Sequence, residues 1–155
     1  MSNEVRAAIL ALDGKSAWGE VETAREALVP LGRNIFPIAL ELFPTLRSYK
    51  ARTSLVYTAV KFALVEEDAV RLGVLALEDR SSIVIHRACM LLAVSRQRDV
   101  IPALEKLLGH KSSEVQNDAH AAIIAIEQQN PNLFLDRNQT GKVTLNVGGL
   151  IQPTL

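Results

Sequence analysis

Three residues, His86, Cys89 and His120, have the types and the spacing of a metal site. His86 and Cys89 are three positions apart, so on a helix they share a face. His120 follows Cys89 by 31 positions, which is the offset of an internal repeat in the sequence. Histidine nitrogen and cysteine thiolate are zinc ligands, and three protein ligands with one water form a catalytic zinc site.

The alternative interpretation of these three residues is structural. A free cysteine is usually a small buried apolar residue, and both histidines would then be ordinary surface groups. Since no carboxylate or further histidine completes the motif, we predict neither a metal site nor a cofactor. The sequence also lacks the GxSxG, HExxH, Walker A and GxGxxG motifs. We therefore expect a protein that is not an enzyme.

A second candidate site is the segment DRNQTGK, residues 136–142, which resembles the start of a calcium-binding loop. Asp136, Asn138, Thr140 and Gly141 stand at its first, third, fifth and sixth positions. The twelfth position, where a bidentate glutamate is needed, is Val147. We favour a hairpin turn in which Gly141 takes a positive φ.

These residues belong to a chain that repeats. Residues 79–96 align with residues 110–127, so that Ser81-Ser82 matches Ser112-Ser113 and Ala88 matches Ala119. A repeat of this period in an apolar-periodic chain indicates a solenoid of stacked helices.

Helices are predicted wherever apolar residues recur at helical spacing. Serines of the two Ser-Ser pairs and Asp99 are expected to cap helices, and Pro44 is expected to end one. Turns of two to four residues require the paired helices to be antiparallel. The predicted helices cover residues 3–12, 20–31, 34–47, 49–65, 67–77, 82–95, 99–108 and 113–128.

After Asn130-Pro131 the helical pattern stops. Val143, Leu145 and Val147 alternate with polar residues, which is the period of a half-buried strand. We predict a β-hairpin over residues 133–147 that packs on the last helix pair and caps the end of the solenoid.

The composition limits the class of protein. Of the 155 residues 48% are apolar, and 17 Lys and Arg balance 17 Asp and Glu. Proteins that bind a phosphate backbone are normally basic, so we expect no nucleic-acid partner. The single cysteine, the absence of a signal-peptide pattern and the short apolar runs predict a cytoplasmic protein with no membrane partner.

The segment DVIPALEKLLGHKSSEVQNDAHAAIIAI, residues 99–126, resembles a HEAT repeat of the short bacterial type found in phycobilin lyase-like proteins. Pro102 stands near the start of its first helix, and Val115 opens an alanine-rich second helix. The preceding copy also fits, and a degenerate third copy covers residues 34–64. Where the family pattern has arginine after the opening valine, this chain has Ile85 and Gln116, and only Arg52 fills that position.

This resemblance implies an all-α fold, a right-handed α-α superhelix of antiparallel helix pairs, here with the C-terminal hairpin as a cap. The expected organisation is a single domain over residues 1–155. Residues 1–33 form an N-terminal helical cap, residues 34–129 form the HEAT-like pairs, and residues 130–155 form the hairpin and tail.

In HEAT-like proteins the second helix of each pair lines the concave face. The repeat then places Arg87 beside Asp118, where we expect either an ion pair between the repeats or a role in partner binding. It also places Cys89 beside His120. Trp18 is expected to cover the N-terminal end of the core, with an exposed anchor as the alternative. The candidate partner-binding residues are Arg52, Tyr57, His86, Arg87, Asn117, Asp118 and His120.

These features favour a non-enzymatic protein-binding module, a bacterial adaptor or a toxin-neutralising immunity protein. Two alternatives come from the resemblance. Phycobilin lyase-like proteins hold a tetrapyrrole in the groove, but this groove has few aromatic residues. Some HEAT-like proteins bind DNA through a basic face. Four basic residues cluster around the fourth predicted helix, although acidic residues 66–68 follow them: Arg47, Lys50, Arg52 and Lys61.

Overall fold

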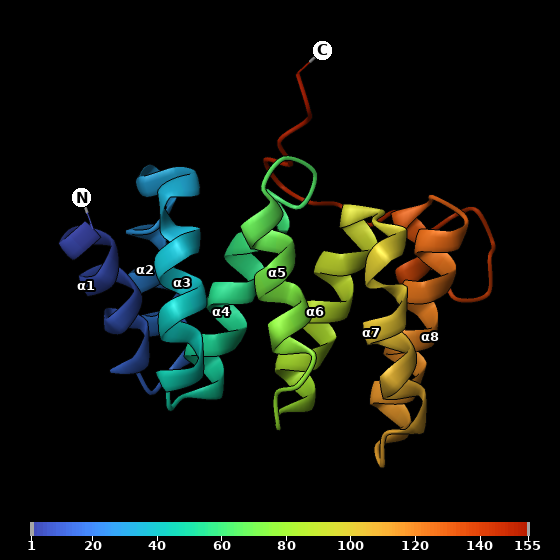
Figure 1. Ribbon diagram of the computed structural model, residues 1–155, viewed down its shortest axis with the longest axis horizontal. Helices are drawn as coiled ribbons and strands as arrows, with labels where there is room; N and C mark the ends of the chain where they lie inside the picture. The colour runs from blue at the N-terminus through green and yellow to red at the C-terminus, as the bar shows by residue number, and fades with distance from the viewer. Residues whose placement is uncertain (1, 155) are drawn as a thin grey trace.

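The computed structural model describes residues 2–154, and the body of this part of the chain is helical. No β strand occurs between residues 2 and 154 (Figure 1). The α helices are α1 Ser2–Asp13, α2 Trp18–Glu26, α3 Phe36–Leu42, α4 Tyr49–Val60, α5 Glu67–Ala76, α6 Ser82–Ser95, α7 Ile101–Glu105 and α8 Ser113–Glu127. Short 3₁₀ segments cover Val29–Ile35, Phe43–Thr45, Arg98–Val100, Lys106–Gly109 and Pro131–Phe134.

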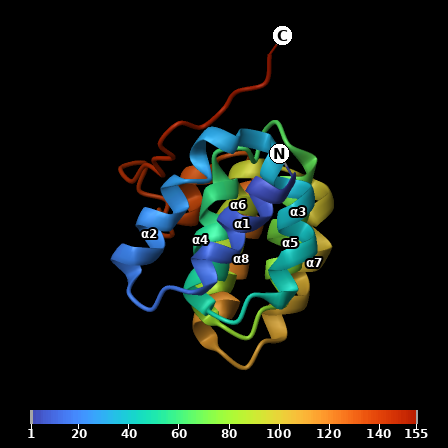
Figure 2. The ribbon, with the colours of Figure 1, turned by 90° about the vertical axis from the view of Figure 1, so that its left-hand side faces the viewer.

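The helices form antiparallel pairs that stack side by side in chain order (Figure 1). Helices α3, α5 and α7 form one layer and the even-numbered helices form the other, while α1 lies between α4 and α3 (Figure 2). Within the even layer, α4 packs between α2 and α6, and α6 packs between α4 and α8. A turn of a few residues leaves the next helix no path except back along its predecessor, which is why each pair is antiparallel.

Helix ends occur where local chemistry interrupts the backbone hydrogen bonds. The Ser112 hydroxyl caps α8 by accepting a hydrogen bond from the Val115 amide, as predicted. Helix α3 stops before Pro44, also as predicted, because proline has no amide hydrogen to donate. The second and fourth helices end earlier than predicted, at Glu26 and Val60, and tighter turns follow them.

Helix α6 lies at the centre of the core, because α4, α5 and α8 all pack against it. Gly73 of α5 faces α6, and a Cβ atom at this position would lie 2.9 Å from Leu91 Cδ2. A real Cβ atom does not approach another carbon so closely, so glycine is what allows α5 and α6 to pack at this distance. Gly73 therefore sets the separation between α5 and α6.

The predicted C-terminal β-hairpin is wrong. Pro131–Phe134 is a 3₁₀ turn, so the segment expected to supply the first strand is not extended, and residues 135–154 contain no strand. Leu145 and Val147 are half-buried against the core, while Val143 is 41% exposed. The alternation in the sequence therefore reflects packing on helices and not pairing between strands.

The tail, residues 135–154, runs back over the helix ends from α8 toward α4 (Figures 1 and 2). The Leu145 amide donates a hydrogen bond to Asn132 Oδ1 at 2.9 Å. The Ile151 amide donates one to the backbone oxygen of Lys61, the residue after α4, also at 2.9 Å. No helix within residues 2–154 has both the length and the apolar character required to cross a bilayer.

Candidate functional site

The aromatic residues with a polar group are exposed to solvent, whereas the phenylalanines are buried. The single tryptophan and both tyrosines are exposed, Trp18 by 45%, Tyr49 by 38% and Tyr57 by 43%. All three lie on even-numbered helices, α2 and α4. All four phenylalanines are buried: Phe36, Phe43, Phe62 and Phe134.

Trp18 and Tyr49 contact each other at the beginnings of α2 and α4. Their ring centroids are 5.9 Å apart with an interplanar angle of 80°, which is the favourable edge-to-face arrangement. The Lys50 ammonium lies 5.5 Å from the centroid of the Trp18 ring. The expectation that Trp18 covers the core is wrong, and its exposure agrees with the alternative of a surface anchor.

Tyr57 is contacted by two guanidinium groups from the neighbouring helices. The Cζ atom of Arg25 in α2 lies 5.3 Å from the ring centroid, and that of Arg87 in α6 lies 4.8 Å from it. Arg25 also forms an ion pair with Glu22, whereas Arg87 has no carboxylate partner among residues 2–154. Each cation–π contact stabilises by about 0.5–1 kcal/mol at an exposed site, so both arginines are positioned but remain accessible.

Ile83 of α6, which is 45% exposed, connects these two groups of residues. It lines one pocket with Tyr49 and another with Arg87. The exposed residues therefore form one surface across three consecutive even-numbered helices. We call this surface the aromatic face, and it consists of Trp18, Tyr49, Lys50, Tyr57, Ile83 and Arg87.

Beside the aromatic face, three side chains form what we call the Asp118 cluster. The carboxylate of Asp118 in α8 lies 3.0 Å from His86 Nδ1 and accepts a hydrogen bond from Arg137 Nη2 at 2.8 Å. The Asp118 side chain is 11% exposed, against 39% for His86 and 38% for Arg137. The buried carboxylate therefore fixes two groups that face solvent.

The aromatic ring of Phe134 supports the Asp118 cluster from below. Its centroid lies 5.3 Å from that of His86 and 5.1 Å from Arg137 Cζ, and Arg137 Nε donates to its backbone oxygen. Burial raises the pKa of Asp118, but the hydrogen bonds from His86 and Arg137 outweigh burial and lower it below the ordinary value of 3.8. Asp118 is therefore ionised at neutral pH.

A pocket of about 450 Å³ opens over the Asp118 cluster. An adjoining pocket of about 280 Å³ contains His120 and shares Asn117 and Arg137 with the first. The larger pocket is lined by Ser82, Ile83, His86, Arg87, Glu114, Asn117, Asp118 and Arg137.

Most of the residues predicted from the sequence are brought together here. His86, Arg87, Asn117 and Asp118 line one pocket, and Tyr57 reaches it through its contact with Arg87. His120 lies in the adjoining pocket. The predicted ion pair between Arg87 and Asp118 is wrong, because Asp118 binds His86 and Arg137 while Arg87 stacks on Tyr57.

Arg52, the remaining predicted residue, does not lie on this surface. It is 4% exposed and forms two hydrogen bonds with Asp79, from Nε at 2.7 Å and from Nη2 at 3.1 Å. Its Nη1 atom donates to the backbone oxygens of Leu46 and Arg47, both at 3.1 Å. Four of its five N–H donors bond to Asp79 and to the turn before α4, so Arg52 mainly stabilises the fold.

The three residues with metal-ligand spacing do not form a common site. Cys89 is fully buried, and burial raises the pKa of its thiol. His86 directs Nδ1 to Asp118, while His120 is exposed in a separate pocket. Among residues 2–154 no three side chains of His, Cys, Asp or Glu are grouped as metal ligands.

The calcium-like segment closes on its own carboxylate. Asp136 accepts hydrogen bonds from the Thr140 amide at 2.9 Å, the Thr140 hydroxyl at 2.8 Å and the Gly141 amide at 2.7 Å. These bonds, led by the Thr140 amide, lower the pKa of Asp136. Gly141 has a φ of 75°, so it takes the positive φ that the turn interpretation requires. The donors around Asp136 are protein N–H and O–H groups, which occupy the oxygens that a cation would need.

Two side chains that contact the candidate site were missed from the sequence. Arg137 lies in a tail segment that the repeat does not cover, so no register placed it beside Asp118. Arg25 lies in the first helix pair, which the repeat also does not cover. Nothing in the spacing of either residue indicates its contact, although the helical period does place Arg25 on the exposed side of α2.

The arrangement is suited to holding a ligand by stacking, hydrogen bonds and charge. No hydroxyl or thiol within residues 2–154 is hydrogen-bonded to the His86 ring, so the Asp–His pair has no nucleophile to activate in this geometry. No family model matches the sequence, and no curated protein and no solved structure is significantly similar to it.

Proposed function

We propose that the protein is a non-enzymatic protein-binding module of the HEAT-like solenoid type. The observation that carries the proposal is the aromatic face, which contains every tryptophan and tyrosine of the chain in contact with lysine or arginine. Tryptophan, tyrosine and arginine are the residues that most often dominate the energy of protein–protein interfaces. Rigid aromatic rings bury a large area and lose little conformational entropy on binding.

The Asp118 cluster supports the same proposal. Its pocket lies next to the aromatic face and shares Ile83 and Arg87 with it. Arg137 is held by Asp118 before any partner arrives, so fewer rotamers are lost when it binds. Anchors that are ordered in advance favour recognition of a specific partner over nonspecific adsorption. Within this class, an adaptor or a toxin-neutralising immunity protein is the role we propose.

A site-specific cross-linking experiment tests this proposal. A photoreactive phenylalanine analogue is placed at Tyr57 and, as a matched control, at Leu108, which is 42% exposed on the segment after α7. We expect one discrete protein adduct in the native host from position 57 and none from position 108. Identical adducts at both positions, or no adduct at position 57, would contradict the proposal.

The partner identified in this way then permits a binding measurement. Truncation of an interface hot spot weakens binding by about 2 kcal/mol or more, so Tyr57→Ala is expected to weaken the complex at least about thirtyfold. The matched control is Leu10→Ala, because Leu10 is 46% exposed on α1. Equal affinities of the two variants would show that the partner binds elsewhere.

A further inference from the structure

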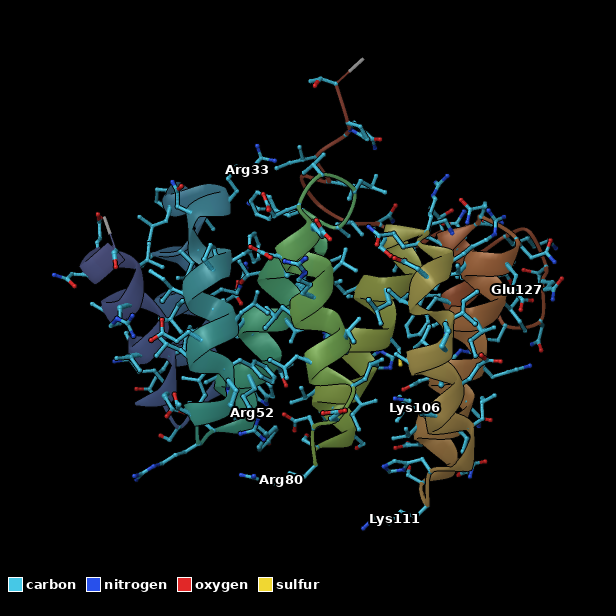
Figure 3. All side chains as sticks on the ribbon, viewed as in Figure 1. Arg33, Arg52, Arg80, Lys106, Lys111 and Glu127 are labelled. Carbon is cyan, nitrogen blue, oxygen red and sulfur yellow. The ribbon has the colours of Figure 1, made fainter. Side chains whose placement is uncertain are left out.

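A pocket of about 400 Å³ lies between the beginnings of α4 and α6, at the edge of the aromatic face. Arg47 comes from the turn before α4, and Arg80 comes from the turn before α6. Figure 3 shows Arg80 extending from that turn away from the helices. The residues that line the pocket are Arg47, Tyr49, Arg52, Arg80, Ser81, Ser82 and Ile83.

The charge in this pocket is unbalanced. Its lining contains three arginines and no carboxylate. Asp79 neutralises Arg52 from behind, through a pair in which both side chains are only 5% exposed. Neither Arg47 nor Arg80 forms an ion pair within residues 2–154. Neither guanidinium therefore pairs with a carboxylate. Asp13 accepts hydrogen bonds from the backbone amides of Arg47 and Ser48, and Glu78 lies in the adjoining pocket beside Arg80, so these two acids offset the charge without pairing with it.

Hydroxyl groups complete the lining. Ser81 and Ser82 form no side-chain hydrogen bond within the described chain, and Ser81 does not cap α6 with its hydroxyl. This differs from Ser48 and Ser112, whose hydroxyls accept bonds from the first turns of α4 and α8. The Tyr49 ring forms an edge-to-face contact with Trp18, and the Tyr49 side chain also lines the pocket. The pocket thus combines two free guanidiniums with three hydroxyl donors.

We propose that this pocket binds the phosphate of a phosphorylated side chain. A phosphate monoester carries a charge of about −1.5 to −2 at neutral pH and has three strong acceptor oxygens. Two unpaired arginines match this charge, and a guanidinium binds phosphate oxygens through two parallel hydrogen bonds. A carboxylate has one charge and two oxygens, so it would leave one arginine without a partner.

The inference that the phosphate belongs to a protein side chain rests on the proposed function. Tyr49 and Ile83 belong to both the pocket and the aromatic face, so a partner segment on that face reaches the pocket without a break. A nucleic acid fits this surface less well, because bases need free ring faces for stacking. The Tyr57 ring is already in contact with Arg25 and Arg87, and the Trp18 ring with Lys50.

The site itself is tested with inorganic phosphate, without any partner. Amide and arginine side-chain resonances of the intact protein are followed by NMR during titration at constant ionic strength, with chloride as the reference anion. We expect saturable 1:1 shifts at Ser81, Ser82 and Ile83 and at the side chains of Arg47 and Arg80. In Arg47→Ala combined with Arg80→Ala, the affinity is expected to fall at least tenfold.

The matched control is Lys111→Ala, which removes an exposed cation from the equivalent turn before α8 (Figure 3). This variant is expected to bind phosphate with unchanged affinity. All three cations are exposed, so the variants retain the fold, and an unchanged dispersion of the amide spectrum verifies this. Equal loss in both variants, or shifts that follow ionic strength alone, would overturn the proposal.

The type of molecule that bears the phosphate is tested with three probes of equal length. These are a phosphoserine peptide, the same peptide with glutamate in place of phosphoserine, and oligothymidylate. We expect the phosphopeptide to bind at least tenfold more tightly than the glutamate peptide. Preference for the glutamate peptide or the oligonucleotide would overturn the assignment to a phosphorylated side chain. Failure of phosphate to bind leaves the cross-linking result at Tyr57 unaffected, so the two proposals can fail separately.

Discussion

Two buried carboxylates of this protein bind cationic side chains, and they do so with opposite consequences. The side chains of Asp79 and Arg52 are each 5% exposed and bind each other, the turn before α4 and the Ser81 amide. Asp118 is buried to a similar degree, but its two partners, His86 and Arg137, are each more than a third exposed. The first pair is largely closed to ligands, whereas the second directs its two partner side chains toward solvent.

The difference shows why a charged residue cannot be assigned a role from its type alone. Four of the five N–H donors of the Arg52 guanidinium bond to protein oxygens, so it has little left to offer a ligand. Arg137 uses Nη2 for Asp118 and Nε for the Phe134 carbonyl, and its Nη1 remains free. Desolvation of a buried pair is a large penalty, and it is compensated only where every donor and acceptor is matched.

The largest effect is expected from breaking the closed pair. Arg52→Ala leaves Asp79 buried with only the Ser81 amide as a partner, which should lower the free energy of unfolding by about 3–5 kcal/mol. Urea denaturation measures this, with the exposed Arg47→Ala as a control that changes it by less than about 0.5 kcal/mol. A loss below 1 kcal/mol in Arg52→Ala would show that the pair is not closed to water.

A smaller effect is expected from Asp118→Asn, because its partners can turn toward solvent. We expect a loss of about 1–3 kcal/mol and faster hydrogen exchange or proteolysis in the tail, which Arg137 connects to α8. Arg137→Ala should act on the same contact, so the double variant should lose less than the sum of the two single variants. If the stability losses of the two single variants simply add in the double variant, Arg137 and Asp118 do not stabilise the fold through a shared contact.

Protonation at low pH removes the charge of Asp118 without a substitution, so the pH dependence of stability tests the same contact. Asp118 has a pKa lowered by its hydrogen bonds, so its contribution is fully present above its unfolded value near 3.8 and is lost as the pH falls through the lower folded value. As the pH falls from about 5 to below the folded pKa of Asp118, the free energy of unfolding should therefore decrease more in the wild-type protein than in Asp118→Asn. Denaturation curves at a series of pH values measure the difference, and parallel curves would contradict the assignment.

The smallest effect concerns the neutral counterpart of Arg52. Gln116 stands four residues after its cap Ser112, as Arg52 does after Ser48, and its side-chain amide donates to the His110 carbonyl. Gln116→Ala removes one hydrogen bond without exposing a buried charge, so a loss of about 0.5–1.5 kcal/mol is expected in urea denaturation. A loss as large as that of Arg52→Ala would mean that the turn, and not the charge, governs both sites.

The sequence predicted the approximate positions of the helices because apolar spacing and proline are local signals. Of the predicted caps, Ser112 is confirmed, whereas the side chains of Ser81 and Asp99 do not cap a helix. The repeat also placed His86, Arg87, Asn117 and Asp118 on one surface, since these residues lie within the two copies that define its register. The register could not show which neighbour binds Asp118, because that choice depends on Arg137 from outside the repeat.

The failures have a common physical cause. Alternating apolar residues at 143–147 are equally compatible with a strand and with an extended chain lying on helices, and only tertiary packing decides between them. Arg52 looks like a surface residue until Asp79, which lies in a different helix pair, is placed behind it. Trp18 was expected to cover the N-terminal end of the core, but it is 45% exposed, and the four phenylalanines are the buried aromatic residues.

The path of the tail has a consequence for how the chain unfolds. In a stack of helix pairs each pair contacts only its neighbours, so both ends can fray independently. Here the bond between the Ile151 amide and the Lys61 carbonyl joins the chain after α8 to the end of α4. The segment from α5 to α8 is thereby enclosed in a loop, and its amides should exchange with solvent as one cooperative unit. The helices α1 and α2 lie outside that loop, so the molecule has one end that frays, not two.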